Sequence, residues 1–213
     1  GILTMERLRM LPSVQIYFNA LAQMLCASVE PFKKECLGVL FGSLPTKTKN
    51  QFIIAFVQPV QCVNRKRFTE IKPNDKSWFR LQDFFSQIPG RSRYLGDFHS
   101  HAEWGNLNPS DKMSDQDIVA MQEDSYKLEI IIAISSCAKT PKLWAVEEDG
   151  SLCGSFGSKK TMYDFIISAY VLYSDDADDD QKPKPKKIKI ATPEFIKSFN
   201  RVLERRRART NKL

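Results

Sequence analysis

Apolar residues recur along the chain at the two spacings that distinguish strands from helices. They alternate with polar residues around position 14 and then follow at helical intervals up to Val29, which predicts a short strand and then a helix. The runs 37–41 and 51–60 are strand-like and are joined by a turn-rich stretch, so we expect an antiparallel pair. A further helix is expected over residues 77–86, where aromatic residues lie among polar ones.

The second half of the chain predicts the centre of a sheet. Residues 94–101 are strand-like, and Ser114 begins a helix, because serine is a preferred N-cap and acidic residues follow it in the first turn. Residues 128–135 form a continuous run rich in isoleucine, as expected in the middle of a sheet. The stretch 143–156 predicts a hairpin that turns at Asp-Gly. The apolar run 163–173 fits either a last strand or a buried helix.

This alternation of elements predicts an α/β protein with a central sheet flanked by helices. Because 42% of the 213 residues are hydrophobic, the chain can bury one sizeable core. We expect an N-terminal extension over residues 1–11, a folded domain over 12–174, a charged linker over 175–191 and a basic C-terminal helix over 192–213. The linker is predicted because aspartates, lysines and prolines dominate it and cannot bury a core.

Net charge is unevenly distributed along the chain. The formal charge is +7, but residues 182–213 carry 12 Lys or Arg against two Glu, a net of +10, so residues 1–181 carry a net of −3. The folded part therefore does not have the charge of a nucleic-acid binder.

No apolar stretch approaches the ~18 residues of a membrane span, and no signal-peptide pattern is present at the start, so we expect a soluble cytoplasmic protein. The five cysteines include no CxxC pair, which argues against a disulfide framework or a cysteine zinc site.

The two histidines of the chain, His99 and His101, are separated by one residue at the end of a predicted strand. Side chains alternate across a strand with a period of two, so both imidazoles project from one face and can bind one metal ion. A catalytic zinc site needs about three protein ligands and one open position. We expect Asp117 to supply the third ligand from the first turn of the following helix, with Asp111 and Asp115 as the alternatives.

Taken together, these residues resemble the JAMM motif of the MPN-domain metalloproteases, also called JAB domains. That family has a glutamate before a strand of the GxLxG type, and later an HxH followed by SxxD. The resemblance covers roughly residues 12–175. The matching segments are Glu35 with the strand up to Gly42, His99-Ser-His101, and Ser114-Asp-Gln-Asp117.

The loop after the histidines departs from the family pattern. The family usually has Pro after the second histidine and seven residues before the serine, whereas this chain has Ala102 and twelve residues between His101 and Ser114. A competing alignment uses Ser110 as the serine, but Met113 then stands where a carboxylate ligand is needed. Ser110 and Ser114 therefore remain alternatives for the active-site serine.

The resemblance implies a zinc metalloprotease with an MPN-type fold, a mixed and largely antiparallel sheet flanked by helices. One zinc ion bound by the two histidines and Asp117 would lower the pKa of its water towards ~7 and supply hydroxide at neutral pH. Glu35 would hold and deprotonate that water and then pass the proton to the leaving amine. Ser114 would donate a hydrogen bond to the developing oxyanion, with Ser110 as the alternative.

Enzymes of this family commonly cleave isopeptide or peptide bonds after the C-terminus of ubiquitin or a ubiquitin-like modifier, and compact members are frequent in prokaryotes. The modifier's tail typically binds by adding a strand beside the active site, for which residues 102–105 or 107–108 would serve, with Trp104 as a contact. Some relatives act on sulfur-carrier proteins or small peptides instead. Several need a partner subunit.

The alternative interpretation is a catalytically silent binding module. Its basic tail, residues 182–189 and 205–209, would contact nucleic acid or an acidic partner protein. Phosphate contacts of this kind weaken steeply as salt rises. The acidic run 175–180 would compete for the same basic residues.

Overall fold

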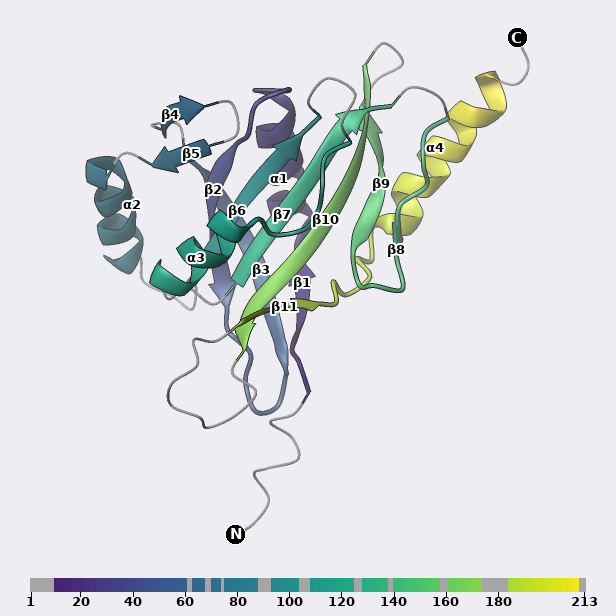
Figure 1. The fold of residues 1–213 in the computed structure, drawn as a ribbon. Helices are drawn as coiled ribbons and strands as arrows, with labels where there is room; N and C mark the ends of the chain where they lie inside the picture. Colours follow the sequence, from purple (N-terminus) through teal and green to yellow (C-terminus); the bar gives the residue numbers. More distant parts are fainter. Residues whose placement is uncertain are drawn as a thin grey trace.

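The fold is a mixed α/β structure in which one curled sheet runs through most of the chain (Figure 1). It is seen in a computed structural model that describes residues 10–60, 63–67, 70–73, 75–87, 93–103, 108–124, 128–137, 140–157, 161–173 and 184–210. No helix in these ranges is both long enough and apolar enough to cross a membrane.

Within the described residues the main sheet has nine strands, in the order β1-β3-β2-β6-β7-β10-β9-β8, and β11 pairs with β10. These strands are β1 (Ser13–Ile16), β2 (Leu37–Ser43), β3 (Gln51–Pro59), β6 (Arg93–Ala102), β7 (Leu128–Ser136), β8 (Ala145–Val146), β9 (Leu152–Gly157), β10 (Met162–Tyr173) and β11 (Lys184–Ile188). A separate pair consists of β4 (Val63–Arg67) and β5 (Glu70–Pro73). The helices are α1 (Phe18–Val29), α2 (Asp75–Gln87), α3 (Asp115–Asp124) and α4 (Ile196–Thr210).

Strands β6 and β7 lie next to each other in the middle of the sheet and run parallel, with α3 in the connection between them (Figure 1). Every residue from Leu128 to Ile134 is buried, which explains the unbroken apolar run of β7. Gly96 of β6 has a φ of 149°, and a side chain there would overlap the Leu128 carbonyl. A glycine at this position therefore lets the two strands approach.

The two faces of β6 have different environments from Phe98 onward. Phe98 and Ser100 are both 0% exposed; Phe98 belongs to the main core, which includes the apolar residues of α1, and the Ser100 hydroxyl accepts a hydrogen bond from the backbone N–H of Cys36. Alternation along the strand turns His99 and His101 to the opposite face. One side of this strand is therefore structural, and the other side is available for chemistry.

Most of the predicted elements are confirmed. Residues 13–16 form a strand followed by α1, the runs at β2 and β3 pair antiparallel, and the run 163–173 is the strand β10 rather than a helix. The hairpin at the Asp-Gly turn is β8 with β9. The pair β4 and β5 was not expected from the polar sequence in this region.

The expected charged linker over residues 175–191 is wrong in its second half. Residues 184–188 form β11, which pairs antiparallel with residues 169–173 of β10. Strand β9 covers only residues 162–167 of the same edge of β10, so β11 satisfies backbone groups that would otherwise be unpaired. Ile188 and Ile190 are buried, and their alternation with lysines was the available signal for a strand. Residues 175–183 lie outside the described part of the chain.

Helix α4 packs on the domain through aromatic rings. Phe199 stacks on Trp144, with ring centroids 4.4 Å apart, and Phe195 lies edge-on to Trp144 at 6.3 Å. The Asn200 side chain accepts a hydrogen bond from Trp144 N–H at 2.7 Å and donates one to its carbonyl oxygen at 2.9 Å. The C-terminal helix is therefore part of the folded core.

We predict that Phe199→Ala lowers the free energy of unfolding by about 2 kcal/mol, less than the ~3–5 kcal/mol of a fully buried phenylalanine, because Phe199 is only partly buried. Chemical denaturation monitored by Trp fluorescence measures the change. Val202→Ala on the same helix is the control, because Val202 is 48% exposed and its truncation should change stability by less than ~0.5 kcal/mol. Equal effects of the two variants would contradict the docking of α4.

Candidate metal centre

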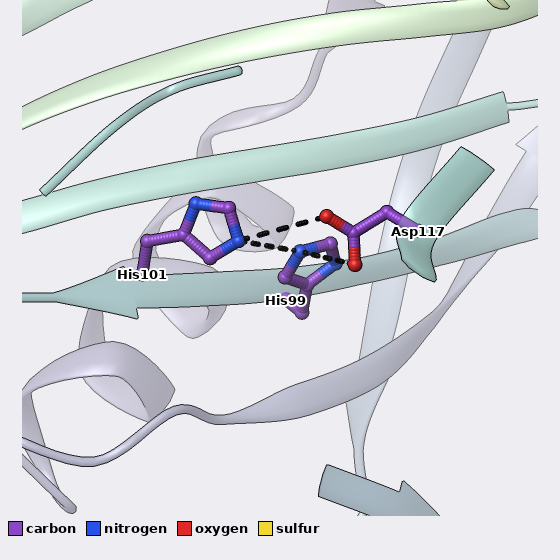
Figure 2. Close-up of side chains that lie close together, drawn as sticks. All are labelled: His99, His101 and Asp117. Carbon is purple, nitrogen blue, oxygen red and sulfur yellow. Dashed lines mark hydrogen bonds and ion pairs between the residues drawn. The ribbon is translucent and has the colours of Figure 1, made fainter. Parts of the chain in front are cut away.

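His99 and His101 at the end of β6 and Asp117 in the first turn of α3 converge on one point (Figure 2). The Nε2 atoms of the two histidines are 3.0 Å apart. Asp117 Oδ1 lies 3.5 Å from His99 Nε2, and Asp117 Oδ2 lies 3.8 Å from His101 Nε2. One ligand atom from each of the three residues lies within 4.8 Å of the other two. No other such group of His, Cys, Asp or Glu is found among the described residues.

The other ring nitrogen of each histidine contacts a hydrogen-bond acceptor. His99 Nδ1 lies 2.7 Å from Glu129 Oε1, and His101 Nδ1 lies 2.6 Å from the backbone carbonyl oxygen of Ser110. A carbonyl or carboxylate oxygen only accepts, so both Nδ1 atoms carry hydrogen. In histidine metal ligands, such an acceptor fixes the tautomer and directs the other nitrogen at the metal.

The charges of the site favour a cation at the point where the three side chains meet. Burial lowers the pKa of His99, but the carboxylates of Asp117 and Glu129 outweigh burial and hold that pKa well above its ordinary value. Burial and the charge on His99 lower the pKa of His101, so its ring is neutral. His99 Nε2 faces both His101 Nε2 and the Asp117 carboxylate, and a metal ion between them would satisfy both nitrogens and the carboxylate.

Asp117 is held by a reciprocal cap at the start of α3. Its backbone N–H donates to Ser114 Oγ at 3.2 Å, and its Oδ2 accepts hydrogen bonds from Ser114 N and Oγ, both at 2.7 Å. Burial raises the pKa of Asp117, but the hydrogen bonds and charge of His99, together with those from Ser114, hold it well below its usual range. Asp117 is therefore an ionised carboxylate of fixed orientation, as a metal ligand would need to be.

Glu35 lies two residues before the start of β2, which pairs with the histidine strand β6. Leu37 is the register partner of His99, and Ser100 N–H donates to the Cys36 carbonyl at 3.0 Å, so the ladder continues and places Glu35 alongside His101. Burial raises the pKa of Glu35 to about 7; the charge on His99 lowers it and that of Asp117 raises it. A carboxyl group that titrates near neutral pH beside such a cluster suits a general base.

The two candidate serines differ in what their hydroxyl groups do. Ser114 Oγ donates its hydrogen to Asp117, so this hydroxyl orients the ligand. Ser110 Oγ accepts a hydrogen bond from Lys112 N at 3.1 Å, which leaves its own hydrogen for donation. Both serines border the cluster, and the choice between them for the oxyanion remains a prediction.

The alternative acids expected from the sequence are not in the cluster. Asp111 Oδ2 instead accepts hydrogen bonds from Ser168 Oγ at 2.6 Å and Lys187 Nζ at 3.0 Å. Asp115 is exposed at the first position of α3. Trp104 lies outside the described residues, as do residues 105 and 107 of the expected modifier-binding segments.

Sequence reasoning missed Glu129 and the Ser110 carbonyl, which hold the two histidine rings. Glu129 is only 2% exposed. A buried acid requires a partner, so the single charged residue in the predicted buried strand 128–135 was the signal. A backbone carbonyl leaves no comparable signal in a sequence.

Comparisons with known proteins bear on the fold alone. No model of a protein family matches the chain, and no curated protein sequence matches it. Among solved structures, the chain is similar to the solution structure of protein DSY2949 from Desulfitobacterium hafniense, with a TM-score of 0.50 and 12% sequence identity over 85% of this chain and 94% of that chain. At this identity the similarity indicates a shared architecture and says nothing about activity.

We predict that Glu129→Gln weakens zinc binding by about tenfold or more, because the amide accepts the His99 Nδ1 hydrogen less strongly than the carboxylate does. Titration of zinc against a chromophoric chelator measures the affinity. Glu123→Gln is the matched control, since Glu123 is exposed on α3. Equal zinc affinity of Glu129→Gln and the wild type would show that the carboxylate does not orient a ligand.

Proposed function

We propose that this protein is a JAMM-type zinc hydrolase that cleaves isopeptide or peptide bonds after the C-terminus of a ubiquitin-like modifier. The observation that carries the proposal is the convergence of His99, His101 and Asp117 beside Glu35. Two imidazoles and one carboxylate are the ligand set of a catalytic zinc site with one position left open. The order of these residues in the chain is that of the family motif the sequence resembles.

The donor set fits zinc by its chemistry as well as by its number. Each histidine has an acceptor on Nδ1 that leaves Nε2 for the metal, and Asp117 is ionised. Zinc bound there supplies a Lewis acid, which polarises a carbonyl group and lowers the pKa of a water molecule to ~7.

The remaining roles fall to residues of this chain. Glu35 accepts a proton from the attacking water and delivers it to the departing nitrogen, since an amine leaves far more readily than an amide anion. Ser110 or Ser114 donates a hydrogen bond to the oxygen on which negative charge develops. The His99 ring is kept in place by Glu129 within the sheet, so the reacting groups need little rearrangement.

The preference for a ubiquitin-like modifier rests on the sequence resemblance. An extended C-terminal tail binds naturally to an exposed strand edge next to the metal. Several members of the family that the sequence resembles need a partner subunit for activity, and sulfur-carrier proteins or small peptides are the alternative substrates. Nucleic-acid binding by the tail has less support, because Lys187 pairs with two acids of the folded domain and Arg207 donates to the Pro141 carbonyl.

We predict about one zinc ion per chain in the wild type and its loss in Asp117→Ala, because this variant removes the carboxylate ligand. Elemental analysis of the purified, zinc-repleted protein measures the content. Asp115→Ala removes an exposed acid two residues away and should keep the metal. Zinc retained by Asp117→Ala and lost by Asp115→Ala would reassign the ligand.

We predict that Glu35→Gln lowers the hydrolysis rate by about 10²–10⁴-fold and leaves the zinc content unchanged, because the amide cannot accept the proton. The substrate is ubiquitin, or a related modifier, with a fluorogenic amine on its C-terminus. Glu30→Gln, an exposed substitution at the end of α1, is the control. Chelation should abolish the wild-type rate, and a Glu35→Gln variant as active as the wild type would refute the assigned role.

A further inference from the structure

The loop that carries Ser110 is attached to strands β10 and β11 of the sheet. Asp111 Oδ2 accepts hydrogen bonds from Ser168 Oγ of β10 at 2.6 Å and from Lys187 Nζ of β11 at 3.0 Å. The Tyr170 hydroxyl of β10 donates to the backbone carbonyl of Asp111 at 3.0 Å. We call Asp111, Ser168, Tyr170 and Lys187 the loop anchor.

Lys187 is itself held from a second side. Its Nζ lies 2.5 Å from Asp149 Oδ2, and Asp149 Oδ1 accepts hydrogen bonds from Ser151 N and Oγ at 3.0 and 2.6 Å. The Lys187 side chain is 24% exposed, so its pairing with Asp111 is better shielded than that of a solvated lysine. Hydrogen bonds and charges from the two acids outweigh burial and raise the pKa of Lys187.

Asp111 of the loop anchor directly follows Ser110, whose carbonyl oxygen contacts the His101 ring. The Ser110 carbonyl, which accepts from His101 Nδ1 at 2.6 Å, belongs to the same planar peptide group as the nitrogen of Asp111. Fixing both the side chain and the carbonyl of Asp111 therefore limits how far the Ser110 carbonyl can rotate or move. The orientation of His101 depends on that carbonyl.

The two histidines are supported in different ways. His99 is held by Glu129, which belongs to the neighbouring strand β7. His101 is held by a carbonyl from residues 108–114, which form neither helix nor strand. The position of the Ser110 carbonyl is fixed only if its loop is fixed. The sheet holds the partner of His99 directly, whereas the loop that supports His101 needs an attachment of its own.

We propose that the loop anchor positions His101 for metal binding, so that Lys187 and Tyr170 act on the metal centre through Asp111 and the Ser110 carbonyl. This inference rests on the zinc site of the proposed function. It links the strand β11 to the metal centre through Lys187, which contacts Asp111. Lys187 and Tyr170 are positioning residues.

The test measures metal binding by the full-length protein. Zinc affinity is determined by chelator competition, and the visible absorption of the Co²⁺-substituted protein reports ligand geometry. We expect Lys187→Met and Tyr170→Phe to weaken zinc binding by about tenfold and to change the Co²⁺ spectrum. Lys187→Arg, which keeps the charge between the two acids, should restore most of the affinity. Lys189→Met, an exposed loss of charge two residues away, should have no effect.

The outcomes separate this inference from the zinc site itself. If the wild type binds zinc, and Lys187→Met and Tyr170→Phe both keep its affinity and Co²⁺ spectrum, this inference is wrong and the zinc site stands. No zinc binding by the wild type would overturn both. If Lys187→Met does not fold, Tyr170→Phe decides, because it removes one hydroxyl group. A lower melting temperature with unchanged affinity would show that the loop anchor stabilises the fold only.

Discussion

The parallel pairing of β6 with β7 is the constraint on which the candidate site depends. It aligns Asp97 with Glu129 and His99 with Ile131, so that the Glu129 carboxylate reaches the His99 ring from the adjacent strand. A parallel connection needs a crossover, and α3 in that crossover brings Asp117 to the end of the histidine strand. One topological feature therefore brings together His99, the acid that contacts its ring and Asp117, which are two of the three proposed ligands and one supporting group.

Burying these charges is unfavourable unless each is paired. An ionised carboxylate removed from water loses several kcal/mol of solvation, even after the protein relaxes around it. Here Glu129 and Asp117 share the positive charge on His99, and His101 stays neutral. One buried and one partly buried carboxylate face one cation, which leaves an excess of negative charge. The site is therefore suited to a divalent ion, which would neutralise both carboxylates and free His99 of its proton.

The sequence predicts the proposed ligands better than the groups that hold them in place. His99 and His101 follow from strand periodicity, and Asp117 follows from the capping pattern that begins at Ser114. Ligands leave this signal because the chemistry restricts their residue types and the local element fixes their spacing. The supporting groups are determined by tertiary contacts: Lys187 is 76 residues from Asp111, and the Ser110 carbonyl is independent of side-chain identity. Strand β11 was missed for a related reason, since lysines and prolines conceal the alternation that ends in Ile188 and Ile190.

The acidic and basic parts of the sequence are not separate in the folded structure. Divided by sequence, the protein consists of a slightly acidic domain and a strongly basic tail. In the structure, however, Lys187 forms ion pairs with Asp111 and Asp149, which belong to the acidic part, and Arg207 donates a hydrogen bond to the Pro141 carbonyl. Four apolar residues of the same segment are buried in the main core: Ile188, Ile190, Ile196 and Leu203. Part of the basicity therefore compensates charges of the folded domain, and a boundary placed by charge at residue 174 separates residues that fold together.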